Sequence, residues 1–279
     1  MPIIDVHIHC LGFEHTTQGY HEYLATTVLG PDVEGQMQRY SRPEALVELL
    51  DEAGVDYGVV MAEEAPITPG LLTNEYVADL CRGSKRLIPM ASINPYLEQR
   101  PAAELTRLVR EEGFRALKLY PSFQYFYPNE PLVYPIYAAA QELGIPVMLH
   151  TGWAFFPGSR LKYAHPLLLD DVAVDFPRLP LILAHGGRPL WFEEAYYLAR
   201  LHENVYIDVS GLPPNRLLDY FPELERIADK LLFGSDWPGL PTSIGQNIAG
   251  IRRLSLRPET LQKLFWENAA RLLRLDPPD

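Results

Sequence analysis

Cysteine and long apolar runs are both scarce in this sequence of 279 residues. The two cysteines, Cys10 and Cys81, cannot form a disulfide framework or a Cys-x-x-Cys metal site. No apolar stretch reaches the roughly 18 residues that a membrane span requires. Apolar periodicity begins at Ile3, which leaves no room for a signal peptide. We therefore expect a cytoplasmic protein with no membrane partner.

Positive charge is scarce as well. The chain has 24 Lys and Arg residues against 36 Asp and Glu residues, which gives a net charge of −12. It shows no basic run and no aromatic module for stacking bases, so we expect no nucleic-acid partner. A small-molecule substrate is expected instead.

Short apolar runs rich in β-branched residues recur along the chain, and turn residues follow them. Most of these runs are apolar throughout, as is typical of parallel strands that are covered on both faces. The eight predicted strands are 3–9, 57–63, 87–94, 114–120, 146–151, 181–185, 205–210 and 231–236.

Helical patterns lie between these runs. The predicted helices are 42–53, 74–82, 98–112, 131–143, 166–176, 190–202, 215–229 and 258–273. Eight strands that alternate with helices indicate an α/β protein, a (β/α)8 TIM barrel formed by residues 1–279 as a single domain. A doubly wound sheet is the alternative, but no Gly-rich phosphate-binding motif follows the first strand.

Two connections are unusually long, at about 10–41 after the first strand and 153–165 after the fifth. Both leave from the C-terminal ends of strands, which is the face of a barrel that carries the active site. Loops of this length in a compact domain are usually functional. We expect both segments to be lid-like insertions over that face.

Histidines gather at the predicted strand ends. His7 and His9 are two residues apart on the first strand and therefore share a face. His150 ends the fifth strand, His185 ends the sixth and Asp236 ends the eighth. A polar residue that ends an apolar strand is costly unless it has a partner or a function. These five residues are therefore candidates for one site at the C-terminal face of the barrel.

This set of residues resembles the signature of the amidohydrolase superfamily. The similarity is greatest to its amidohydrolase-related branch, which includes decarboxylases, hydratases and metal-dependent hydrolases. It extends to the local sequences Ala-Leu-Lys-Leu-Tyr-Pro at 116–121, Tyr-Pro-Ile-Tyr at 134–137 and Leu-His-Thr-Gly at 149–152. The resemblance covers essentially the whole chain, but its motifs do not specify a reaction.

The resemblance implies one divalent metal ion, with zinc expected, held by His7, His9, His150 and Asp236. Imidazole and carboxylate donors suit Zn²⁺, and a bound water would complete a catalytic site. In that arrangement Asp236 takes or relays the proton of the water. His185 hydrogen-bonds the water or the developing oxyanion.

Lys118 lies on the fourth strand, where binuclear members of the superfamily carry a carboxylated lysine between two metals. In the one-metal branch we expect this lysine to contact a substrate carboxylate, and an outward-facing lysine is the structural alternative. Trp153 and Arg188 are further candidates for substrate binding, the first as a pocket wall and the second as an anion-binding residue. Asp5 is expected to support the site by hydrogen bonding rather than to bind the metal.

Two reactions are compatible with this set of residues. The first is hydrolysis, in which a metal-activated water attacks a carbonyl-type carbon of a small carboxylated substrate. The alternative is non-oxidative decarboxylation by a carbon–carbon lyase, in which His185 or Asp236 handles the proton. A DNase-type barrel would be expected to show a Gly-Glu-x-Gly-like strand end, which the sequence lacks, and a non-catalytic binding barrel would leave the ligand set unexplained. Assembly into a homodimer is left open.

Overall fold

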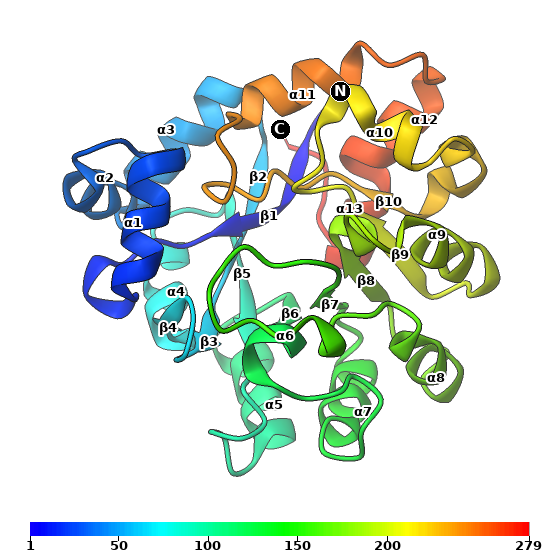
Figure 1. Ribbon diagram of the computed structural model, residues 1–279, viewed down its shortest axis with the longest axis horizontal. Coiled ribbons are helices and arrows are strands. Elements are labelled where there is room, and N and C mark those ends of the chain that lie inside the picture. Colours follow the sequence, from blue (N-terminus) through cyan, green and yellow to red (C-terminus); the bar gives the residue numbers. More distant parts are fainter. Residues whose placement is uncertain (279) are drawn as a thin grey trace.

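Eight parallel strands occupy the centre of the molecule (Figure 1). The structure is a computed structural model that describes residues 1–278. In their order in the sheet, the strands are β1 Ile4–His9, β2 Tyr57–Met61, β5 Leu87–Ser92, β6 Ala116–Leu119, β7 Val147–His150, β8 Leu181–Ala184, β9 Val205–Asp208 and β10 Leu231–Leu232. All eight predicted strands are found, and the predicted α/β class and (β/α)8 barrel are confirmed.

The segment after β10 brings the sheet close to a complete barrel. The backbone N–H of Val6 donates to the carbonyl of Phe233 (2.9 Å), and that of His9 donates to the carbonyl of Trp237 (2.8 Å). The regular strand β10 is shorter than the predicted strand 231–236, whose last residue, Asp236, has a positive φ of 63°. Even so, the segment runs beside β1 and places Asp236 next to His7 and His9.

Helices surround the barrel (Figure 1). Those that the patterns predicted are α3 Pro43–Ala53, α4 Asn74–Arg82, α5 Pro101–Glu111, α7 Tyr134–Leu143, α8 Leu168–Asp175, α9 Phe192–Leu201, α12 Pro258–Gln262 and α13 Asn268–Leu273. A π-helical turn, Lys263–Glu267, joins α12 to α13. Within residues 1–278, none of the helices is both long enough and apolar enough to span a bilayer.

The predicted helix 215–229 is wrong as a continuous element. The chain forms a 3₁₀ turn Pro214–Arg216, a short helix α10 Leu217–Tyr220 and a 3₁₀ segment Leu224–Lys230. Pro222 explains the break, because a proline disfavours the helical conformation of the residue before it. Phe221 accordingly has φ −129° and ψ 76°.

The connections contain elements that the sequence patterns did not reveal. The segment 10–41 holds a 3₁₀ turn Phe13–His15 and the helices α1 Gln18–Thr27 and α2 Val33–Tyr40. The other additional elements are the hairpin of β3 Glu63–Ala65 and β4 Gly70–Leu72, the helices α6 Pro121–Gln124 and α11 Ile244–Arg252, and the 3₁₀ turns Leu161–Tyr163 and His185–Gly187. Helix α11 begins at a capping box made by Ser243 and Gln246, a signal that the sequence does contain.

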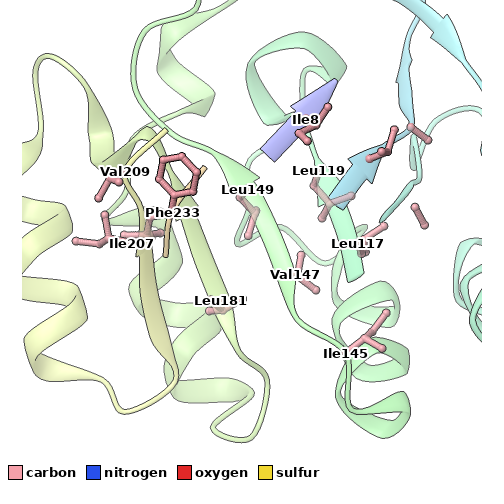
Figure 2. Packing of buried hydrophobic residues seen from close by; sticks show 14 of the residues in the cluster. Ile8, Leu117, Leu119, Ile145, Val147, Leu149, Leu181, Ile207, Val209 and Phe233 are labelled. Atoms are coloured by element: carbon pink, nitrogen blue, oxygen red, sulfur yellow. The ribbon is translucent and has the colours of Figure 1, made fainter. Parts of the chain in front are cut away.

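Alternate residues of the strands pack into two separate apolar clusters. One cluster lies between strands and helices, and Figure 2 shows part of it, with Leu117 of β6 beside Val147 of β7. The other cluster includes Ala116 and Met148, fills the interior of the barrel and reaches α13. This alternation is the period-2 pattern of a strand. It places residues 118 and 150, two positions further along their strands, on the interior side at the barrel mouth.

Strand β1 interrupts this alternation around His7. Val6 belongs to the interior cluster, whereas Ile8, two residues later, belongs to the outer cluster. The register of β1 against β2 shifts between Asp5 and Ile8, as in a β-bulge. His7 lies within this shift and His9 follows it, and the centroids of their rings are 5.2 Å apart.

Candidate active site

Polar side chains replace the apolar ones at the C-terminal end of the barrel. They come from seven segments around the mouth: His7 and His9 from β1, Glu63 from β3, Lys118 from β6, His150 from β7, His185 after β8, Asp208 from β9 and Asp236 after β10. All of them except His9 are buried. A cavity opens onto His9, Glu63, His150, His185 and Asp236. The structure thus brings together the five residues that the strand ends singled out.

His7 is held from behind by Asp208. Its Nδ1 lies 2.6 Å from Asp208 Oδ2, and both side chains are fully buried. Because a carboxylate accepts, Nδ1 donates, and Nε2 is left with its lone pair. The hydroxyl of Ser210 donates to the same carboxylate oxygen at 2.5 Å. Burial, helped by the nearby Lys118, lowers the pKa of His7 to about 4, so the ring is neutral at pH 7.

His9 lies between two carboxylates. Its Nδ1 is 3.4 Å from Glu63 Oε2, and its Nε2 is 3.3 Å from Asp236 Oδ1. Burial opposes a charge on this ring, but Glu63 and Asp236 outweigh burial and raise the pKa of His9 to about 9. His7 Nε2 is also 3.4 Å from Asp236 Oδ1. The Nε2 atoms of both histidines therefore converge on one carboxylate oxygen.

His150 and His185 form the opposite side of the site, with ring centroids 4.9 Å apart. His185 Nδ1 lies 3.1 Å from the Ser210 carbonyl oxygen. A carbonyl only accepts, so Nδ1 donates and Nε2 keeps its lone pair. His150 Nε2 is buried and has no hydrogen-bond partner among the described residues. Burial lowers the pKa of both rings well below the usual 6.5, so both are neutral at pH 7.

The backbone is unusual at two of these residues. His185 has φ 65° and Asp236 has φ 63°, in the left-handed region that residues other than glycine seldom adopt. Gly186 and Gly187 continue the turn after His185 with φ 53° and 76°. A backbone conformation in this region is strained and persists only where the surrounding structure compensates for the strain. Such residues are concentrated at functional sites.

Arg188 covers the second oxygen of Asp236. Its Nη1 donates to Asp236 Oδ2 at 3.2 Å and to the Gly211 carbonyl at 2.8 Å. Burial would raise the pKa of Asp236, but His185, His9 and Arg188 together hold that pKa well below its usual value. Arg188 also lines the cavity, and its buried Nε has no hydrogen-bond partner in the described chain.

Lys118 points into the barrel, which excludes the outward-facing alternative. Its Nζ lies 3.3 Å from His7 Nε2 and 3.5 Å from Met148 Sδ. Burial lowers the pKa of Lys118 to about 8, although the carboxylates of Asp208 and Asp236 pull in the other direction. The lysine is therefore next to the predicted metal ligands.

Asp5 lies below these residues. Its Oδ1 accepts hydrogen bonds from the backbone N–H groups of His7 (3.0 Å) and Ser235 (2.9 Å). Burial raises the pKa of Asp5 to about 7. The carboxyl group thus links β1 to the segment that carries Asp236, as a support beneath the site.

The donor set fits one divalent metal ion. Donor atoms of His7, His9 and Asp236 lie within 4.8 Å of one another. A second group of donor atoms within the same distance comprises His7, His185 and Asp208. His150, whose buried Nε2 has no hydrogen-bond partner among the described residues, belongs to neither group. Imidazole nitrogens combined with a carboxylate oxygen suit Zn²⁺ and other divalent transition metals.

The walls of the cavity are aromatic. They are formed by Tyr20, Tyr120, Phe123, Phe155 and Phe156. Tyr20 comes from α1 and the two adjacent phenylalanines come from the segment 153–165, so both predicted insertions contribute to the cavity.

Trp153 does not line this cavity, contrary to the expectation of a pocket wall. Its side chain is 48% exposed, and its ring packs against Phe155 with centroids 4.8 Å apart. Phe155, two residues later, lines the cavity instead. The chain turns after Gly152 (φ 86°), so counting residues from the strand end does not determine which aromatic side chain points inward.

Two further carboxylates of this site, Glu63 and Asp208, are not among the residues predicted from the sequence. Each follows a residue of the interior cluster at a spacing of two, Met61 in the first case and Tyr206 in the second. The strand alternation that singled out His9 would have found both.

Comparisons with known proteins are consistent with this geometry. A family model described as amidohydrolase matches residues 4–275. A gamma-resorcylate decarboxylase of Polaromonas sp. strain JS666 is 24% identical over 289 residues, covering 82% of this chain and 86% of the relative. A 2-keto-4-carboxy-3-hexenedioate hydratase of Sphingobium sp. strain SYK-6 is 32% identical over 163 residues, covering 49% of this chain and 48% of the relative.

Solved structures share the fold. An uncharacterised TIM-barrel protein from Bordetella bronchiseptica has a TM-score of 0.80 at 24% identity, covering 98% of this chain and 99% of the other. A 5-carboxyvanillate decarboxylase from Novosphingobium aromaticivorans, complexed with manganese and 4-hydroxy-3-methoxy-5-nitrobenzoic acid, has a TM-score of 0.75 at 17% identity, covering 98% and 96%. At these identities the similarity supports the barrel architecture.

Proposed function

The chain belongs to the amidohydrolase family, and on that premise we propose that it is a metal-dependent, non-oxidative decarboxylase of a small carboxylated substrate. This places the carbon–carbon lyase, the alternative drawn from the sequence, ahead of the hydrolase. Curated relatives named as decarboxylases align over about four fifths of the chain. The hydrolase assignment has no comparable support from curated relatives.

The observation that carries the proposal is the position of Arg188. A buried guanidinium lies at the cavity, bound to Asp236 Oδ2 and with an Nε that has no hydrogen-bond partner within residues 1–278. Such a group suits a carboxylate on the substrate, because charged donors form the strongest hydrogen bonds with carboxylates. The aromatic walls would pack against a planar, apolar remainder of the same molecule.

The metal would be held by His7, His9, His150 and Asp236. When bound, the ion supplies a positive centre that binds and polarises oxygen atoms of the substrate. One divalent ion per chain forms part of the proposal. Zinc suits the donors, while a structural neighbour contains manganese, so the identity of the metal is for elemental analysis to decide.

The proton needed by the reaction is handled by the protein. Decarboxylation breaks a carbon–carbon bond, releases CO₂ and leaves a carbon that must take up a proton. His185, neutral and with a lone pair on Nε2, and the ionised Asp236 both lie at the cavity. Either group can take up a proton from solvent water and pass it to that carbon, so that the substrate carboxylate and one proton give CO₂ and the protonated product. Lys118 would hold negative charge on the substrate nearby.

The proposal also includes the setting of the enzyme: a small-molecule substrate, no nucleic-acid partner and a cytoplasmic location, with a homodimer left open. Size-exclusion chromatography with light scattering would decide between monomer and dimer. The single-domain organisation with two insertions belongs to the same proposal.

The experiment is a paired assay on purified protein. Hydroxylated aromatic acids are tested for CO₂ release, and a matched panel of lactones and amides is tested for hydrolysis, each before and after chelation. We expect CO₂ release that is lost on chelation and restored by one equivalent of Zn²⁺ or Mn²⁺. Hydrolysis without CO₂ release would overturn the decarboxylase in favour of the hydrolase. Two metals per chain, with added mass of CO₂ on Lys118, would overturn the one-metal site.

A further inference from the structure

Glu63 is a buried carboxylate that the proposed reaction does not use. It begins β3, two residues after the end of β2, and its residue exposure is 2%. Its Oε2 is buried and has no hydrogen-bond partner among the described residues. An ionised carboxylate in such a position is costly unless it is paired.

This oxygen lies 3.4 Å from Nδ1 of the His9 ring. The opposite nitrogen of that ring, Nε2, is the one that lies beside Asp236. Glu63 therefore approaches His9 from the side away from Asp236. This is the arrangement of Asp208 behind His7, where Nδ1 pairs with a carboxylate and Nε2 points to Asp236.

We propose that Glu63 is the positioning residue of His9, the counterpart of Asp208 for His7. By accepting from Nδ1–H, Glu63 fixes the tautomer and the orientation in which the Nε2 lone pair faces the metal. Carboxylates that act in this way on histidine ligands typically contribute about 10–100-fold to metal affinity. The inference rests on the proposed metal site, and Glu63 itself does not ligate.

The local structure holds Glu63 in this place. Glu63 pairs with Leu72 across the hairpin of β3 and β4. The next residue, Glu64, points elsewhere: its Oε1 accepts from Asn74 at 3.1 Å, and its Oε2 accepts from the Asn94 backbone at 3.2 Å. Two adjacent glutamates thus have separate partners, which makes Glu64 a matched control.

The test compares the Zn²⁺ affinity of the wild type with that of four variants, Glu63→Leu, Glu63→Gln, Glu64→Gln and His9→Asn, by competition with a chromophoric chelator. We expect Glu63→Leu to weaken Zn²⁺ binding about 10–100-fold. Glu63→Gln should recover most of the loss, because its amide oxygen still accepts from Nδ1–H. Glu64→Gln should leave the affinity unchanged. Circular dichroism establishes that each variant is folded.

A second readout is the tautomer of His9 by ¹⁵N NMR of the ring nitrogens. In the zinc-loaded protein we expect hydrogen on Nδ1, and in Glu63→Leu a loss of protection of that hydrogen from exchange with water. If Glu63→Leu binds Zn²⁺ as tightly as the wild type while His9→Asn does not, the role of Glu63 is wrong and the metal site stands. If His9→Asn also binds normally, the proposed metal site itself is wrong.

Discussion

The two sides of the candidate site use the same side chain in different surroundings. On the β1 side, His7 and His9 each have a carboxylate at Nδ1, from Asp208 and Glu63. On the side of β7 and β8, His185 has a backbone carbonyl at Nδ1. His150 completes that side with a buried nitrogen that has no partner among residues 1–278.

The pKa values of the four rings do not divide between the two sides in the same way. Burial lowers the pKa of His150 and His185 well below 6.5, since no carboxylate compensates strongly enough. His7 is also lowered, to about 4, by burial and by Lys118. His9 is raised to about 9, because Glu63 and Asp236 outweigh its burial. Charge on an imidazole here depends on the balance of burial and neighbouring carboxylates, and the residue type alone does not decide it.

Asp236 connects the two sides, so its replacement should have the largest effect. Asn at this position keeps the shape but removes the negative charge that faces His9 and Arg188. We expect Asp236→Asn to lower turnover by about 10⁴-fold, the upper end for a lost acid–base group. Steady-state kinetics and metal analysis of the folded variant measure this. Near-normal turnover with full metal content would exclude Asp236 from catalysis.

Exchanging one histidine at a time on the β7 and β8 side separates ligation from proton transfer. We expect His150→Asn to weaken metal binding strongly. His185→Asn should leave metal affinity nearly intact and lower turnover by about 10²–10⁴-fold, since it removes a group that handles a proton.

Metal titration and kinetics on both variants provide the measurement. Equal loss of metal from the two would show that His185 is a ligand rather than an acid–base group. In that case both His150 and His185 would be metal ligands.

The smallest expected effect concerns Glu64, next to the carboxylate that supports His9. Burial raises the pKa of Glu64 from 4.5 to about 7, and the nearby carboxylates of Glu75, Glu98 and Glu104 add to this rise. The hydrogen bond from the Asn94 backbone lowers the pKa but does not outweigh burial. The folded state therefore binds more protons than the unfolded state between these values. Stability from this group is present below pH 4.5 and is lost as the pH rises to about 7, by up to about 3 kcal/mol.

Urea unfolding of the wild type and of Glu64→Gln between pH 4.5 and 7.5 tests this prediction. The variant should lose this part of the pH dependence, because Gln does not titrate. Identical slopes in the two proteins would mean that Glu64 keeps an ordinary pKa in the folded state. The Zn²⁺ affinity of the variant, measured at fixed pH, should not change.

Much of this protein followed from local sequence patterns. Local patterns predict the eight strands, the barrel and the place of His7, His9, His150 and Asp236 at its mouth. These features depend on apolar runs, on the period of two along a strand and on turn residues at strand ends, which are properties of neighbouring residues. Asp208 and Glu63 follow the same alternation, which therefore predicts that they too face the interior of the barrel.

Only the tertiary structure decided which residues meet across the barrel. Asp208 is 201 positions from His7, and Arg188 reaches Asp236 across 48 positions. The bulge in β1, the outward turn of Trp153 and the two helices within 10–41 likewise depend on packing against distant segments. Local patterns determine which residues face the interior of the barrel. The partner and the charge of each such residue depend on long-range closure and burial, because desolvation and Coulomb energies are set by the neighbours in space.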